Sequence, residues 1–284
     1  MYYGLILISV IMFSSCFAFK DFYRSEKGST FNASIEFTFY SSIMGLLVLL
    51  IINKFHFEFT FFTLIMATIS SINALAFGFC SFKALEKINL SLFSLFSMLG
   101  GMVLPFFQGI IFYNEKITVA KIVCVCFITV ALLLSIKKSD KTGGTIYYIL
   151  IFVLNGMSGV ISKIFTSAPY EKTSASGYSV LSALTTVILA LVILLLLKQK
   201  LVLPTVKQLF ASAGSGILNR IANLILVISL MHVDTSVQYP MVTGGVMICS
   251  TVICLFTKRK PTTKDIIQVI LAFLGMLCLA VIPF

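Results

Sequence analysis

Ten long apolar runs, separated by short polar connections, dominate the hydrophobic pattern of this chain. The runs cover residues 2–19, 33–53, 61–82, 89–112, 119–136, 145–165, 175–197, 207–231, 235–257 and 266–282. A helix needs about 20 mostly apolar residues to cross a bilayer, and the runs are close to that length. They lack the alternation of apolar and polar residues that a transmembrane β-strand shows. The pattern predicts an all-α integral membrane protein with ten transmembrane helices.

The composition supports the same class of protein. Of the 284 residues, 59% are hydrophobic and only 11% are charged, whereas charged residues make up about a quarter of a typical soluble domain. The first run has no basic residue before it and no small-residue cleavage site after it, so we interpret it as a retained helix. We expect a multi-pass protein of the cell membrane, plasma or inner, in contact with lipid.

The basic residues are distributed unevenly between the two sets of connections. Fifteen of the 21 Lys and Arg residues belong to the connections after the odd-numbered runs, and five belong to those after the even-numbered runs. Basic connections stay in the cytoplasm, so this bias predicts that both termini lie outside. The net charge of +11 therefore reflects membrane orientation, and we expect no nucleic-acid partner.

The two halves of the chain resemble each other. The segment FYNEKITVAKI (112–122) aligns without gaps with FTKRKPTTKDI (256–266), and the same offset places Gly100-Gly101 on Gly244-Gly245. SSCFAFKDF (14–22) similarly matches SGVISKIFT (158–166). We therefore expect a first five-helix repeat over 1–138, a connecting loop over 139–144 and a second repeat over 145–284. Because five is odd, the second repeat is inverted, which is typical of carriers with a central cavity.

Arg220 is the most informative single residue. It lies in the middle of GSGILNRIANLILVISL (214–230), where a charge costs from about 3 to more than 10 kcal/mol unless it faces protein or water. The planar, paired donors of a guanidinium suit a carboxylate, which indicates a binding group for an anionic part of a substrate. The alternative is a fixed ion pair or a set of carbonyl contacts that locks two helices together.

Other polar residues lie within the apolar runs and are candidate substrate contacts. They are Asn219, Asn223, Asn73, Asn155, Ser158, Gln108, Tyr239, Thr243 and Tyr40. Polar side chains in a bilayer also hydrogen-bond between helices, so each has that role as its alternative. Asn73 falls near Asn219 when the two halves are aligned.

Three charged residues near the ends of the runs carry further hypotheses. Glu36 is the acidic residue inside a span and is a candidate proton or cation coupling site; its alternative is a first-turn carboxylate favoured by the helix dipole. Lys20 and Lys163 end their runs, and we expect them to anchor the helices by snorkelling, with a gating role as the alternative.

The sequence contains no recognisable catalytic or metal-binding motif. It lacks a Walker loop, G-x-S-x-G and H-E-x-x-H. Its seven cysteines all fall inside apolar runs without metal-site spacing, which favours a packing role. We therefore expect neither enzymatic activity, nor a cofactor, nor a bound metal.

Four stretches resemble the drug/metabolite transporter superfamily in its ten-helix EamA-like branch. These stretches are FKALEKINLSLFSL (82–95), PFFQGIIFYNEKIT (105–118), NGMSGVISKIF (155–165) and YPMVTGGVMICSTVICLFTKRKPT (239–262). The resemblance implies a secondary transporter with alternating access, and it implies cytoplasmic termini, contrary to the charge count. The family has an acidic residue in both repeat turns, where this chain has Glu115 and Arg259.

Together these patterns predict a transporter of a small polar metabolite, such as an amino acid or another carboxylate-bearing solute, working as a monomer or homodimer. Two alternatives stay open. A broad-specificity cation or drug efflux protein would use Glu36, and a non-transporting membrane scaffold would use none of the candidate residues.

Overall fold

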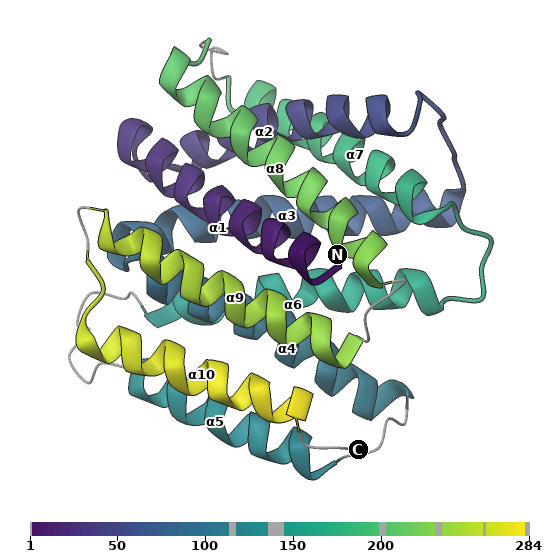
Figure 1. The fold of residues 1–284 in the computed structure, drawn as a ribbon. Helices are drawn as coiled ribbons and strands as arrows, with labels where there is room; N and C mark the ends of the chain where they lie inside the picture. Colours follow the sequence, from purple (N-terminus) through teal and green to yellow (C-terminus); the bar gives the residue numbers. More distant parts are fainter. Residues whose placement is uncertain are drawn as a thin grey trace.

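The computed structural model describes residues 2–113, 118–135, 145–198, 203–230, 235–257 and 260–281. The described residues form ten α-helices and contain no strand. The helices are α1 (Tyr2–Lys27), α2 (Phe31–Ile52), α3 (Phe61–Lys87), α4 (Leu90–Tyr113), α5 (Val119–Ser135), α6 (Thr145–Ser167), α7 (Ala175–Leu196), α8 (Val206–Leu230), α9 (Thr235–Leu255) and α10 (Thr263–Val281). Each predicted run corresponds to one of these helices, shown in Figure 1.

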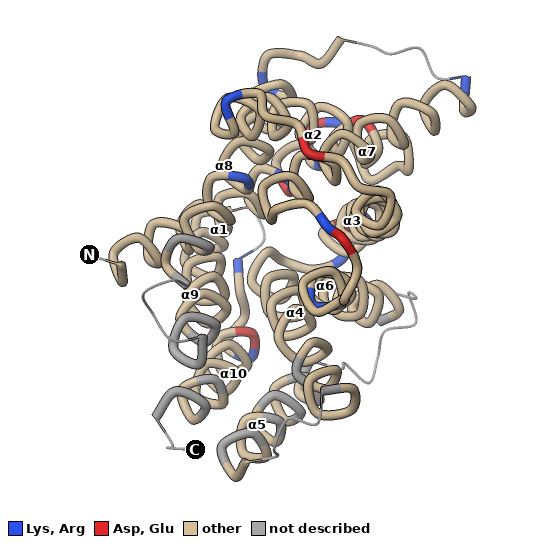
Figure 2. The backbone as a smooth tube through the Cα atoms, turned by 90° about the vertical axis from the view of Figure 1, so that its right-hand side faces the viewer, with Lys and Arg blue, Asp and Glu red and all other residues tan. Residues whose placement is uncertain are grey.

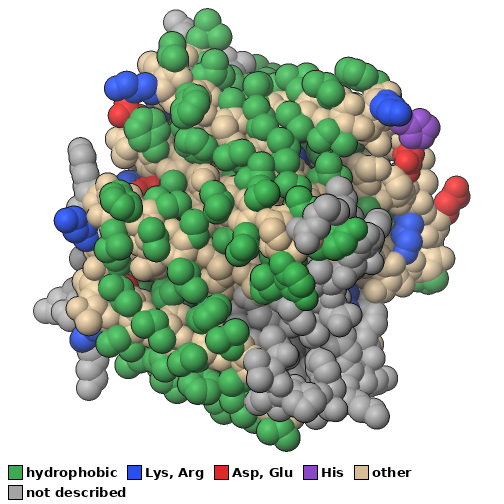
Figure 3. Space-filling model, in the orientation of Figure 1, with side chains coloured by type: hydrophobic (Ala, Val, Ile, Leu, Met, Phe, Trp, Pro, Cys, Tyr) green, Lys and Arg blue, Asp and Glu red, His purple; other side chains and the backbone are tan. Residues whose placement is uncertain are grey.

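Seven of the described helices, α1 to α4 and α6 to α8, are long and apolar enough to cross a membrane. The distribution of apolar side chains on the surface is also that of a membrane protein. In Figure 3, apolar side chains cover the broad middle of the visible face, whereas the charged side chains gather toward its two edges. A soluble protein rarely exposes so large a continuous apolar surface. The protein is therefore an all-α, multi-pass membrane protein.

Side-chain caps fix where several helices begin. Thr30, Thr60 and Ser174 each accept a hydrogen bond from the backbone N–H three residues later, at the starts of α2, α3 and α7. At α10, Thr262 and Asp265 exchange reciprocal side-chain to backbone bonds of 3.3 and 2.8 Å. Such caps satisfy the amide groups that a helix start leaves without partners, so they set the connections between spans.

The helices form two walls when the bundle is viewed along its length (Figure 2). One wall contains α1, α8, α9 and α10, and the other contains α3, α4, α5 and α6. The pair α2 and α7 joins the walls at one edge, and α5 packs on α10 at the other. Between these edges, α4 packs on α9, and the largest buried apolar cluster gathers around this contact.

The two ends of the bundle are tied by different polar contacts. At the 28–30 end, which also carries residues 88–89, Asn89 donates a 2.7 Å hydrogen bond to Asp265. At the 53–60 end, which also carries residues 168–174, the backbone N–H of Ser174 donates to Glu58 over 2.6 Å. This bond and a second from the Ser174 hydroxyl lower the pKa of Glu58. Each end therefore links connections that are distant in the sequence.

Glycine residues allow several helices to meet at backbone distance. A Cβ atom added at Gly100 of α4 would lie 2.0 Å from the carbonyl oxygen of Phe152 in α6, and one added at Gly156 would lie 2.6 Å from the Gly100 carbonyl oxygen. Gly216 of α8 meets the Ser41 carbonyl oxygen of α2 equally closely. Small residues at such contacts are a standard way to pack helices in membranes. The α4–α6 and α2–α8 contacts therefore depend on glycine.

Replacing Gly100 with Ala should force α4 away from α6. We expect Gly100→Ala to lower the free energy of unfolding by about 1–3 kcal/mol, the usual cost of overpacking. Thermal unfolding of the purified protein in detergent would measure this change. Gly4→Ala is the matched control, because a Cβ at Gly4 would meet no atom within 4 Å. Equal stability of the two variants would contradict the close α4–α6 contact.

Candidate functional site

Arg220 lies within α8, ten residues before the end of the helix at Leu230. Its side chain lies against the backbone of α2, because a Cβ atom at Gly45 would be 3.1 Å from Arg220 Cγ and 3.3 Å from Nε. The same position at Gly45 would be 3.3 Å from the Gly216 carbonyl oxygen. The guanidinium is thus held between helices, and its stem runs back over the turn that contains Gly216.

The charge of Arg220 has no neutralising partner among the described residues. The ion pairs that the described part of the chain forms are Arg24–Asp21, Lys27–Glu36 and Lys83–Glu86. No described side chain or carbonyl accepts a hydrogen bond from the partly buried Arg220. An uncompensated charge inside a membrane helix bundle is costly. This site is therefore suited to an anionic ligand that supplies the missing charge.

Tyr178 of α7 brings a second polar group to Arg220. The two side chains are within electrostatic range of each other, and the Tyr178 ring stacks on Phe165 of α6 with centroids 4.3 Å apart. The Tyr178 hydroxyl is buried and makes no hydrogen bond of normal geometry with described residues, although Ser70 of α3 lies nearby. An unsatisfied hydroxyl beside an unsatisfied guanidinium offers two kinds of donor to one ligand.

Two of the predicted substrate contacts are used to join helices. Asn73 of α3 donates to the Leu154 carbonyl oxygen at 2.9 Å and to the Ser158 hydroxyl at 3.0 Å, both in α6. Asn155 of α6 donates to the Ser97 carbonyl oxygen of α4 at 2.6 Å. The structure therefore brings Asn73 and Ser158 together, and it turns Asn155 toward a different helix.

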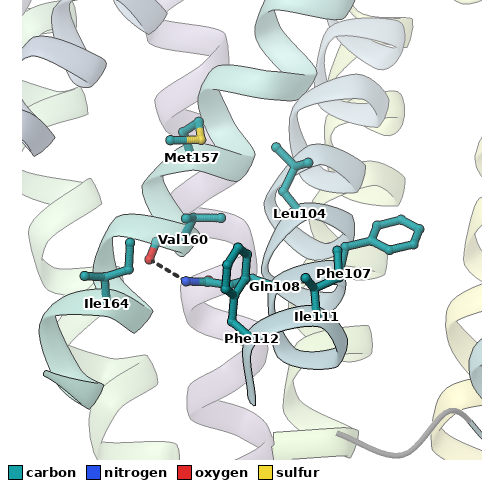
Figure 4. Close-up of a pocket in the computed structure, with 8 residues that line it drawn as sticks. All are labelled: Leu104, Phe107, Gln108, Ile111, Phe112, Met157, Val160 and Ile164. Atoms are coloured by element: carbon teal, nitrogen blue, oxygen red, sulfur yellow. Dashed lines mark hydrogen bonds between the residues drawn. The ribbon is translucent and has the colours of Figure 1, made fainter. Parts of the chain in front are cut away.

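Gln108 belongs to an apolar groove between α4 and α6. The groove has a volume of about 450 Å³ and is lined by apolar side chains such as Phe112 and Val160 (Figure 4). Gln108 donates a 3.5 Å hydrogen bond to the Val160 carbonyl oxygen, and its buried Oε1 has no partner among the described residues. Arg220 is not part of its lining, so the groove is separate from the Arg220 site.

The remaining predicted contacts are divided among α2, α8 and α9. Asn223 is exposed, and it donates to the Asn219 carbonyl oxygen at 2.7 Å within α8. Tyr40 is partly buried beside Phe39, with ring centroids 5.4 Å apart. Thr243 is buried in α9. The side chain of Tyr239, and both Glu115 and Arg259, lie outside the described residues.

Glu36 is buried near the start of α2 and forms an ion pair with Lys27 of α1. The pair connects the end of α1 to the beginning of α2 across the 28–30 connection. A carboxylate held by an ammonium group is less available to a proton or a transported cation than a free one. The structure thus shows Glu36 joining α1 to α2 at the 28–30 end, and its role as a coupling site stays a prediction.

Sequence reasoning did not identify the immediate surroundings of Arg220. Tyr178, Ser70 and Gly45 come from three different helices, α7, α3 and α2, and no local pattern marks them as neighbours of Arg220. Lys20 was expected to snorkel outward, but its ammonium instead points at α3, 4.6 Å from the Phe77 ring centroid. Only the packing of the helices reveals these neighbours.

No protein-family model matches the chain, and no curated protein matches it either. A solved structure, described only as a crystal structure of a protein, has a similar fold. Its TM-score is 0.61 at 14% sequence identity, over 98% of this chain and 96% of that one. At this identity the likeness concerns the fold alone, and it extends over nearly the full length of both chains.

The Lys27–Glu36 ion pair should contribute to the stability of the folded protein. We expect Glu36→Gln to lower the free energy of unfolding by about 2 kcal/mol, because it leaves the Lys27 charge unpaired in a partly buried place. The double variant Lys27→Met with Glu36→Gln should recover most of this loss. Denaturant unfolding in detergent measures both. Glu26→Gln, at an exposed position of α1, is the control, and a double variant less stable than Glu36→Gln would contradict the pairing.

Proposed function

We propose that this protein is a secondary transporter of the ten-helix drug/metabolite transporter type, built from two inverted five-helix repeats. Its substrate is a small metabolite that carries a carboxylate, such as an amino acid or an organic anion. The observation that carries the proposal is the unneutralised Arg220 guanidinium inside the helix bundle, beside the unsatisfied Tyr178 hydroxyl.

The helix contacts support the inverted repeats. In the proposed repeat, each of α1 to α5 corresponds to the helix five places along, α6 to α10. Under this correspondence, the α1–α8 contact matches α6–α3, the α1–α9 contact matches α6–α4, and the α2–α8 contact matches α7–α3, and all of these contacts are present. The α2–α7, α4–α9 and α5–α10 contacts convert into themselves. A bundle of unrelated helices has no reason to pack in such matched pairs, whereas two related halves facing each other do.

The repeated glycines fit the same arrangement. A Cβ atom at Gly101 of α4 would lie 2.8 Å from Asn155 of α6, and one at Gly245 of α9 would lie 3.0 Å from Val10 of α1. In the proposed repeat, α4 corresponds to α9 and α6 to α1. Equivalent glycines therefore receive equivalent helices, which is what a shared ancestral packing would produce.

The chemistry favours an anionic or zwitterionic solute over a cation. Arg220 offers planar donors that match a carboxylate, and Tyr178 offers a hydroxyl from the facing helix. The alternative of cation efflux would use a buried carboxylate, but Glu36 is engaged by Lys27. We also propose that the 28–30 end faces the cytoplasm, because the connections at that end carry the excess of Lys and Arg.

Removing the Arg220 charge should abolish transport of carboxylate-bearing solutes. We expect Arg220→Gln to reduce uptake into proteoliposomes at least about tenfold, since a charge-assisted hydrogen bond contributes about 1.5–3 kcal/mol. Arg220→Lys should restore only part of the activity, because an ammonium lacks the paired planar donors. Tyr178→Phe should weaken apparent affinity while keeping the stacking on Phe165.

An uptake screen with three classes of solute separates the carboxylate transporter from the cation efflux protein and the scaffold. Anionic, zwitterionic and cationic solutes are screened for uptake by the unaltered protein, Arg220→Gln and Glu36→Gln. Loss of uptake confined to Glu36→Gln, with cations as the transported class, would favour the efflux alternative. Absence of uptake for every solute by a folded protein would refute the proposed function and favour a scaffold.

A further inference from the structure

Lys20 is a second cation that turns into the bundle. It lies in α1, seven residues before the end of the helix at Lys27, and its side chain is partly buried. Its Nζ atom is 3.5 Å from the Ser81 hydroxyl and 4.6 Å from the centroid of the Phe77 ring, both in α3. A hydroxyl and a ring face leave donors of the ammonium unused, because Lys carries three.

Three carboxylates near that end are engaged by groups other than Lys20. Asp21 pairs with Arg24, Glu36 pairs with Lys27, and Glu86 accepts from Ser29. Among the described residues, none forms an ion pair with Lys20. The positive charge of Lys20 therefore has no counterion among the residues that the structure describes, and the same holds for Arg220.

Lys20 and Arg220 belong to two neighbouring helices of the same wall, α1 and α8. Helices α1 and α8 run antiparallel (Figure 1), and Cys16 Sγ lies 3.4 Å from the Ser215 carbonyl oxygen at their contact. Lys20 is four residues beyond Cys16, and Arg220 is five beyond Ser215. At 1.5 Å per residue their Cα atoms are roughly 13 Å apart along the helices.

Helical side chains point toward the N-terminus of their own helix, which directs each of these two toward the level of the Cys16–Ser215 contact. The position of Arg220 over the turn of Gly216 follows this rule. The two cationic heads are thus closer together than their Cα atoms are.

An aromatic cluster closes the bundle behind Lys20. Tyr23, Phe37 and Phe82 are all buried, with ring centroids 5.1 to 6.1 Å apart. Tyr23 follows Lys20 by three residues, so these rings lie between Lys20 and the 28–30 end. These rings therefore separate the Lys20 ammonium from that end of the bundle.

We propose that Lys20 is a second anion contact and that the substrate class is an elongated dianion, with one acidic group held at Arg220 and the other at Lys20. The inference rests on the proposed function, because it takes Arg220 as the first contact. Dicarboxylates with a flexible chain between the acidic groups are the simplest members of this class. Two cations on neighbouring helices, both without a counterion among the described residues, favour two negative charges over one.

The experiment measures how a homologous series of α,ω-dicarboxylates, and monocarboxylates of matched chain length, compete for uptake into proteoliposomes. For the unaltered protein we expect the best dicarboxylate to compete at least about tenfold better than its matched monocarboxylate, with an optimum at one chain length. Lys20→Gln should remove this preference, so that a dicarboxylate competes no better than its matched monocarboxylate, while Lys20→Arg should retain it.

Lys83→Gln is the matched control, since Lys83 is in α3 near the same end but pairs with Glu86. It should keep the dicarboxylate preference, and thermal unfolding should show that all variants fold. Two results would overturn the inference while leaving the proposed function standing. The first is equal competition by dicarboxylates and monocarboxylates in the unaltered protein, and the second is an equal loss of competition by both series in Lys20→Gln. Failure of the unaltered protein to transport any carboxylate would refute both.

Discussion

The arrangement of this protein is governed by the cost of holding the Arg220 guanidinium inside an apolar bundle. The described residues supply neither an ion pair nor a hydrogen bond to it. They supply a recess instead: glycine at position 45 of α2 leaves room for the side chain, and Tyr178 of α7 provides a polar neighbour. Ionisable residues within membrane-spanning helices generally face the interior of the bundle or a water-filled cavity, and the Arg220 side chain lies between α2 and α8.

The close glycine contacts complement this recess. Where α4 meets α6, glycines bring backbones together and Asn73 and Asn155 bond α6 to its neighbours. These contacts make rigid units out of helices that share little polar surface. The Arg220 site lies at a different place, among α2, α7 and α8, where the buried Tyr178 hydroxyl has no hydrogen-bond partner among the described residues.

The number of helices and their approximate spans could be predicted from the sequence because length and apolarity alone define them. Their ends could not: α1 was expected to stop near residue 19, but it continues to Lys27, since its last turns are amphipathic and escape a hydrophobicity count. Arg220 stood out as a charge in an apolar run. Whether Asn73 bonds a helix or a solute could not be known from residue type, because that depends on which helix faces it.

Labelling of a cysteine placed at residue 220 tests the central claim most directly. In a variant whose seven native cysteines are replaced, Arg220→Cys should react with a small, water-soluble, membrane-impermeant thiol reagent, because a thiolate forms only where water reaches it. If the cysteine resists the water-soluble reagent but reacts with a lipid-soluble one, the guanidinium of the native protein does not border an aqueous path, and the carrier account is contradicted.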